Sequence, residues 1–244
     1  EFVENNQTKQ KNRRAYFSLA ELALWIGSAC VISAAFFAFD GDNILAFFAS
    51  LVGVTALIFN AKGNPAGQAL MIAFSVIYGI ISYSCAYYGE MITYLAMTAP
   101  MAAMALIDWL RHPSGAGKSE VKINRLRGAE YVFALVLSGA VTAIFYFILR
   151  HFNTARLAWS TVSVFTSFAA AYLTFRRSPA FALAYAANDL VLIVLWAFAT
   201  AENSGYISVL VCFCVFFAND IYGFFSWKKI WKRQNREKIS AEKI

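Results

Sequence analysis

Two pairs of adjacent polar residues lie inside long apolar runs of the sequence, where polar side chains are rare. Asn188 and Asp189 form one pair, and Asn219 and Asp220 form the other. Ionisable and amide side chains are costly within a lipid-spanning helix, so they indicate a ligand pathway or a buried hydrogen bond. An amide both donates and accepts hydrogen bonds, which suits it to a small polar ligand. We therefore expect Asn188, Asp189, Asn219 and Asp220 to line a substrate-binding site.

Aromatic residues accompany both pairs at helical spacing. Phe181, Tyr185 and Asn188 are separated by four and three positions, so they share one helix face. Asn219 and Tyr222 share a face of a second helix in the same way. On such faces the aromatic side chains could stack on the ring of a ligand, and the amides could form hydrogen bonds with its hydroxyl groups. Structural hydrogen bonds between helices are the alternative role for both asparagines.

Further polar and aromatic residues lie near the ends of the apolar runs. Gln68 lies at the start of one run, where it could form an inner gate or extend toward the lipid headgroups. Trp159 and Trp196 lie toward the opposite side and are candidates for a gate. Trp109 and Trp227 are expected to anchor their helices at the membrane interface, as tryptophan commonly does.

The composition places these residues in a membrane. Apolar residues make up 60% of the 244 residues and charged residues only 14%, whereas a soluble domain carries about 25% charged residues. Eight apolar stretches are each long enough, at about 20 residues, to cross the hydrocarbon layer. Each must be helical, because unpaired backbone groups cannot face lipid. The expected spans are residues 16–38, 43–60, 66–87, 91–110, 131–149, 157–175, 180–200 and 206–227.

Basic residues collect on alternate connecting segments. All of the 21 lysines and arginines except Arg150 and Arg156 fall on one side of the membrane when these spans are used. The positive-inside rule makes that side cytoplasmic, so we expect both termini in the cytoplasm and the protein in a bacterial inner membrane, in contact with its lipids. The net charge of +7 follows from these segments. It does not indicate a face that binds nucleic acid.

The sequence contains no signature of an enzyme or a metal protein. His112 and His151 fall in connecting segments on opposite sides of the membrane, so they cannot share a site. The four cysteines, one of them Cys85, lie in apolar runs without histidine partners. No G-x-x-x-x-G-K-[ST] phosphate loop occurs. We expect no catalytic residue, no metal and no cofactor.

Two parts of the chain resemble each other. The segments 62–65 and 176–179 are basic turns that end in proline, each directly before an apolar run. Proline is favoured at a helix start because its missing N–H is not needed there. Both parts also contain a tyrosine followed 21 residues later by a tryptophan, namely Tyr88 with Trp109 and Tyr206 with Trp227. The similarity indicates an internal repeat.

The repeat predicts two three-helix units, residues 43–110 and 157–227. A single helix at 131–149 between them makes the two units parallel, and the helix at 16–38 is additional. Parallel repeats of this kind are found in SWEET-type transporters. The expected fold is an all-α membrane protein with a SWEET-like 3+1+3 bundle. Its cytoplasmic segments are residues 1–15, 111–130 and 228–244.

A series of motifs follows in a characteristic order between residues 43 and 230. It consists of the Tyr88-Gly-Glu90 turn, Trp109, Trp159 ahead of the Arg176-Arg177 turn, Asn188, and Gly223-x-x-x-Trp227 before a basic tail. In this order and spacing the sequence resembles the PnuC-type family of nicotinamide riboside (vitamin B3) transporters. It departs from the family pattern W-x-x-W-x-x-x-N/D, where it has Phe181-x-x-Ala184-x-x-x-Asn188.

The resemblance implies the same bundle, a homotrimer with one pathway in each protomer, and facilitated diffusion of nicotinamide riboside into the cytoplasm. A separate kinase would then trap the substrate for NAD biosynthesis. Because both family tryptophans are replaced, another vitamin such as thiamine or riboflavin is an alternative substrate. A membrane scaffold or enzyme without transport activity is the alternative from a different functional class.

Overall fold

The structure is a computed structural model, and it describes residues 16–39, 41, 44–84, 88–115, 119–202 and 204–241. The expected cytoplasmic segment 1–15 and Cys85 lie outside these residues. The described residues contain helices and one isolated β-bridge between Pro113 and Val121, but no strand. The expectation of an all-α protein is therefore confirmed.

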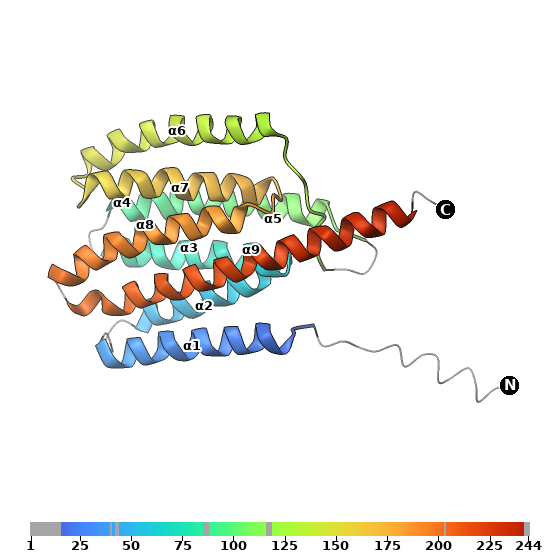
Figure 1. The fold of residues 1–244 in the computed structure, drawn as a ribbon. Helices are drawn as coiled ribbons and strands as arrows, with labels where there is room; N and C mark the ends of the chain where they lie inside the picture. Colours follow the sequence, from blue (N-terminus) through green and yellow to red (C-terminus); the bar gives the residue numbers. More distant parts are fainter. Residues whose placement is uncertain are drawn as a thin grey trace.

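Eight helical spans of the described chain are long and apolar enough to cross a membrane, as expected (Figure 1). Seven of them are single helices: α1 (Leu19–Phe39), α2 (Ile44–Ala61), α3 (Ala66–Ser84), α6 (Gly128–His151), α7 (Leu157–Phe175), α8 (Phe181–Glu202) and α9 (Ile207–Ala241). The remaining span consists of α4 (Tyr88–Ile92), a π-helical segment (Thr93–Thr98) and α5 (Ala99–Arg111). A short 3₁₀ helix (Ser204–Tyr206) precedes α9.

Six helices surround the interior of the bundle. α2 packs against α3, α3 against α5, α5 against α7, α7 against α8, α8 against α9, and α9 against α2. The first expected unit supplies α2 to α5, and the second supplies α7 to α9, so the units meet along two seams, α2 with α9 and α5 with α7. This arrangement is compatible with the SWEET-like plan. We name the end where α1 begins and α9 ends the termini end, and the opposite end the far end (Figure 1).

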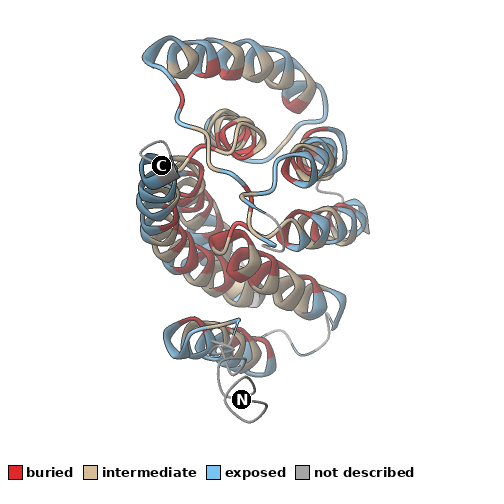
Figure 2. Ribbon diagram, turned by 90° about the vertical axis from the view of Figure 1, so that its right-hand side faces the viewer, coloured by how far each residue is buried: buried red, intermediate tan, exposed pale blue. Residues whose placement is uncertain are grey.

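Two of the eight spans, α1 and α6, lie outside this ring (Figure 2). α6 packs against α7 and leaves large apolar side chains exposed, including Val136 and Phe147. α1 packs against α2 and α9, across one seam between the units. The Ser28 hydroxyl of α1 accepts a hydrogen bond from the Asn219 amide of α9 at 2.8 Å. Glu21 of α1 forms an ion pair at 2.9 Å with Lys62, which lies directly after α2.

The two turns of the expected repeat have the same backbone conformation. Gly63 has φ of 66° and Arg177 has φ of 55°. Each is two residues before the proline of its turn. A positive φ is easily adopted by glycine and rarely by arginine. The positive φ at both Gly63 and Arg177 supports the internal repeat.

Trp109 and Trp227 are buried inside the bundle and do not face lipid, contrary to the expectation that they anchor their helices at the membrane interface. Their exposed fractions are 1% and 0%, and both belong to a buried cluster with Phe181 at the termini end. Each indole N–H donates to a backbone carbonyl of the other unit. Burial of a tryptophan requires a partner for its N–H, and these carbonyls provide one.

The fourth span contains a wide π-helical turn. It begins at Tyr88, three residues before the expected start, and its π segment precedes Pro100. The Ala99 N–H bonds the Tyr94 carbonyl five residues earlier, which is the π pattern. A proline lacks the N–H that an α-helix needs at that position, so the chain before it can adopt another register. π turns are frequent at functional sites.

Candidate functional site

A central cavity lies inside the six helices, between the two units. Lining residues come from α2, α3, α7, α8 and α9 and, in the fourth span, from α4 and the π segment rather than α5, and the empty volume including the mouth is about 990 Å³. Its polar lining consists of Asn60, Tyr78, Glu90, Thr93, Tyr94, Thr98, Thr154, Ser160, Ser163, Ser167, Tyr185, Asn188, Asp189 and Asp220. Apolar and aromatic walls with a few polar groups are typical of sites for small organic ligands.

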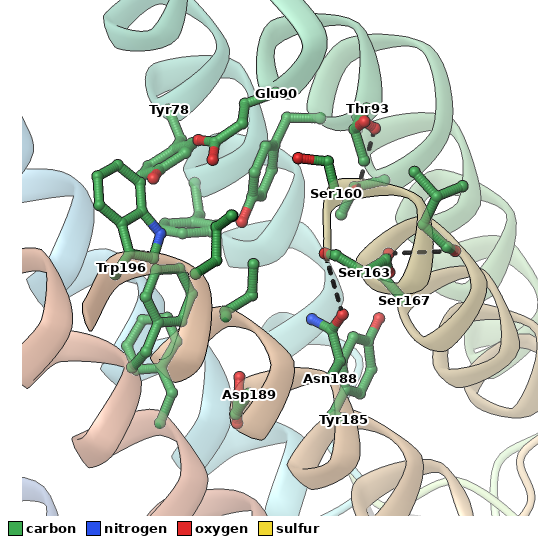
Figure 3. Close-up of a pocket in the computed structure, with 18 of the residues that line it drawn as sticks. Tyr78, Glu90, Thr93, Ser160, Ser163, Ser167, Tyr185, Asn188, Asp189 and Trp196 are labelled. Carbon is green, nitrogen blue, oxygen red and sulfur yellow. Dashed lines mark hydrogen bonds between the residues drawn. The ribbon is translucent and has the colours of Figure 1, made fainter. Parts of the chain in front are cut away.

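The Asn188 amide is held in place from the neighbouring helix. The Thr166 hydroxyl of α7 donates to the Asn188 Oδ1 at 2.7 Å, and the Ser163 hydroxyl donates to the same oxygen at 3.4 Å. The amide nitrogen is turned toward the cavity (Figure 3). Asn188 is therefore fixed in orientation and presents a hydrogen-bond donor to a ligand.

Asp189 and Asp220 bring two carboxyl groups together at the middle of the membrane-spanning region. Asp189 is on α8 and Asp220 on α9, their exposed fractions are 4% and 5%, and their side chains are hydrogen-bonded to each other. Asp189 Oδ2 is buried and has no hydrogen-bond partner among the described residues. A polar atom left in this state is unfavourable, and a ligand with a donor or a positive charge would satisfy it.

Aromatic rings surround these polar groups. Tyr185 and Phe181 line the cavity from α8, as the helical spacing predicted, with ring centroids 6.3 Å apart. Tyr78 of α3 and Tyr94 of the π segment face the cavity from the first unit, with centroids 4.5 Å apart. Rings from both units can therefore contact a flat ligand between them.

The cavity is open toward the far end. A second pocket at that end is lined by Tyr88, Phe152 and Arg156, among others, and six residues border both pockets. The shared residues are Gly89, Glu90, Thr154, Ser160, Leu195 and Trp196. We call this shared boundary the neck. Trp196, one of the two expected gate residues, is thus a neck residue, and its indole lies near Glu90 and Tyr78 (Figure 3).

The cavity is closed at the termini end. Phe181 forms its floor, and behind Phe181 lie the rings of Trp227 and Trp109, with centroids 4.6 Å and 6.4 Å from it. Further toward the termini, Arg177 pairs with Asp108 at 2.8 Å. The structure therefore shows a central site accessible from one side only.

Four of the expected site and gate residues lie outside the central cavity. Asn219 contacts Ser28 of α1, and Tyr222 also faces α1, near Glu21. The amide of Gln68 donates to the Asn60 Oδ1 at 2.8 Å, so Gln68 supports a lining residue and is not itself part of the lining.

Trp159, the fourth of these residues, is 38% exposed. Its ring lies 6.4 Å from that of Phe198 on the surface of the bundle. It borders neither the central cavity nor the pocket at the far end.

Other lining residues were not expected from the sequence. Ser160, Ser163 and Ser167 form a hydroxyl stripe on the cavity face of α7. Their spacing of three and four positions in an apolar run is a signal that could have identified them. Glu90 was assigned to a connecting turn, whereas the structure places it on α4 at the neck.

Comparisons with known proteins agree on one family. Residues 43–229 match the family described as nicotinamide mononucleotide transporter. A nicotinamide riboside transporter PnuC from Neisseria mucosa is 25% identical over 217 residues, which cover 87% of this chain and 82% of the relative. A transporter of the same name from Haemophilus influenzae is 20% identical over 195 residues, covering 80% of this chain and 83% of the relative.

A solved structure has the same fold. The crystal structure of the vitamin B3 transporter PnuC superposes with a TM-score of 0.78 and 23% sequence identity. The similarity covers 89% of this chain and 94% of the solved chain. The arrangement of helices around the central cavity is therefore that of a known membrane transporter.

Proposed function

Because the chain belongs to the nicotinamide mononucleotide transporter family, we propose that it carries nicotinamide riboside across the bacterial inner membrane by facilitated diffusion. Two relatives that match more than three quarters of the chain are named as transporters of this riboside. The observation that carries the proposal is the cavity between the two helical units, which combines an oriented amide, aromatic rings and carboxyl groups.

The cavity has a partner for each part of nicotinamide riboside. The positively charged pyridinium ring can stack on Tyr185 or Tyr94, whose faces attract cations. Asn188 can bond the carboxamide of the ligand, and the serine hydroxyls of α7 can bond its ribose. Asp189 and Asp220 provide carboxyl oxygens beside the ring. We propose these residues, with Phe181 as the floor, as the binding site.

The charge of the cavity favours the riboside over its phosphorylated form. No lysine, arginine or histidine occurs among the lining residues in the described part of the chain. A phosphate monoester carries a charge of about −1.5 to −2 at neutral pH and requires cationic partners when it is buried. The phosphate of nicotinamide mononucleotide would therefore meet carboxyl groups and no cationic partner among the described lining residues.

Transport requires the central site to be exposed alternately to the two sides. We propose that the two units rock against each other, so that Trp196 closes the neck while the cluster of Phe181, Trp227 and Trp109 separates. The basic segments at the termini end place that end in the cytoplasm by the positive-inside rule. The structure would then represent the state that is open to the outside.

The assembly and the metabolic setting are also part of the proposal. The exposed apolar side chains of α6 suit contact with lipid or with further copies of the chain. We propose that the protein assembles as a homotrimer. A facilitator moves its substrate only down a gradient, so a cytoplasmic kinase would be needed for accumulation. The protein itself would have no enzymatic activity.

Vesicles that contain only this protein test the proposal. Labelled nicotinamide riboside should equilibrate across their membrane and should never be concentrated, with or without an imposed proton or sodium gradient. Accumulation driven by either gradient would contradict facilitated diffusion, and a complete lack of uptake would contradict the proposed substrate.

The alternative substrates are thiamine and riboflavin. They remain alternatives because Phe181 and Ala184 replace two tryptophans of the family pattern. A ligand that binds the folded protein raises its melting temperature, and at a fixed concentration the increase is larger for a ligand of higher affinity. A panel of nicotinamide riboside, nicotinamide mononucleotide, thiamine and riboflavin should show the largest increase with the riboside.

A further inference from the structure

We propose that Glu90 is a charge-selective residue at the neck, so that the pathway takes organic cations and discriminates against neutral molecules of the same shape. The proposal rests on the proposed transport function and specifies the chemical class of the cargo. Glu90 was not expected as a site residue from the sequence. The comparisons with known proteins assign it no role.

The position of Glu90 brings it close to any passing molecule. Its side chain borders both the central cavity and the pocket at the far end, and so does the indole of Trp196 on α8. Its carboxyl group is hydrogen-bonded to the Tyr78 side chain of α3 (Figure 3). A molecule that moves between the two pockets therefore passes both the carboxyl group of Glu90 and the indole of Trp196.

Among the described residues, no basic side chain lines the central cavity that Glu90 borders. The one cationic side chain that lines the pocket at the far end, in the described part of the chain, is Arg156. Arg156 pairs with Glu202 and lies 4.9 Å from the centre of the Phe198 ring. A pathway lined by charges of one sign between apolar walls concentrates ions of the opposite sign.

The cavity beyond the neck also favours a cation. Asp189 Oδ2 is buried there without a hydrogen-bond partner among the described residues, and Asp220 lies beside it. The rings of Tyr94 and Tyr185 border the same cavity and can face a positive charge. Glu90 thus precedes a second position that also lacks a counter-charge. A cationic cargo would supply the counter-charge at both positions.

The matched cargoes for a test are nicotinamide riboside and its dihydropyridine form. Both have the same skeleton and hydrogen-bonding groups, but only the first carries a positive ring. In vesicles that contain the wild-type protein, we expect kcat/KM for the cation to exceed that for the neutral form by about tenfold or more. Added salt should reduce this preference, because salt screens charges.

The variant Glu90→Gln keeps the size and a hydrogen-bonding group but removes the charge. We expect it to raise KM for the cation by about tenfold and to leave KM for the neutral form nearly unchanged, so that most of the preference is lost. The control variant Glu130→Gln makes the same exchange at the termini end, where Glu130 pairs with Arg176. It should retain the wild-type preference.

The outcomes separate this inference from the proposed function. If Glu90→Gln lowers kcat/KM equally for both cargoes, Glu90 has a structural role and the inference is overturned. Equal transport of both cargoes by the wild-type protein would also overturn it, and this comparison needs no variant. If the wild-type protein transports neither cargo, the proposed function is wrong and the inference fails with it.

Discussion

The indole rings of Trp109 and Trp227 lie 5.4 Å apart, and each donates a hydrogen bond to the first helix of the opposite unit. Trp109 on α5 bonds the Thr174 carbonyl of α7 at 2.9 Å. Trp227 on α9 bonds the Asn60 carbonyl of α2 at 2.7 Å. Asn60 and Thr174 each lie five residues before the proline of the repeated turn. The two tryptophans therefore make reciprocal contacts across the seams between the units, as an internal repeat would produce.

These contacts give a prediction about the closure of the termini end. Replacement of Trp109 or Trp227 by phenylalanine keeps a ring but removes the indole hydrogen bond. The carbonyl of Thr174 or Asn60 keeps its bond to a backbone N–H of the following turn, so the expected cost is about 0.5–1.5 kcal/mol for the lost bond. We expect a lower melting temperature for each variant in detergent. Trp231→Phe is the control, because Trp231 lies beyond the cluster and contacts Arg125 at the surface. Unchanged stability of the first two variants would contradict a role in closure.

Asn188 is predicted to bind substrate. Its amide is oriented by Thr166 and Ser163 and faces the cavity. Asn188→Ala should therefore raise the dissociation constant for nicotinamide riboside by about tenfold or more, since a buried hydrogen bond to the ligand is lost. Isothermal titration of the purified variant measures this. A variant that fails to fold would instead support a structural role for the amide.

Asn219 is predicted to stabilise the fold and not to contact the substrate. Its amide bonds Ser28 across the contact between α1 and α9. Asn219→Ala should lower the free energy of unfolding by about 0.6 kcal/mol, the average for such bonds in membranes. Affinity for nicotinamide riboside should stay at the wild-type value. A large loss of affinity with unchanged stability would place Asn219 in the binding site.

Trp196 is predicted to control passage through the neck. Its large ring borders both pockets and packs against Tyr206 and Phe213, at centroid distances of 5.4 Å and 6.5 Å. Trp196→Ala should widen the neck and speed the release of bound riboside toward the far end. Stopped-flow measurement of dissociation from protein in detergent tests this. An unchanged release rate would mean that the neck is closed by another group.

Several features of the fold could be predicted from the sequence because the bilayer imposes them. Apolar length determined the eight spans, and the repeated turns around Gly63 and Arg177 indicated the two units. Helical spacing correctly predicted that Phe181, Tyr185 and Asn188 share a face, and the structure places that face on the cavity.

Other features depend on contacts that spacing alone does not determine. Asn219 and Tyr222 do share a face, but that face meets the additional helix α1 and not the cavity. Periodicity identifies which residues lie together on a helix and not which neighbour they meet. Glu90 was missed because the fourth span begins earlier and widens into a π turn before Pro100, and apolar length does not reveal such a turn.

A structure determined with bound nicotinamide riboside tests the central claim most directly. We expect density for the riboside between the two helical units, with the pyridinium ring against Tyr185 or Tyr94 and a hydrogen bond to Asn188. Density at another place, or an empty cavity at a concentration that saturates binding, would contradict it.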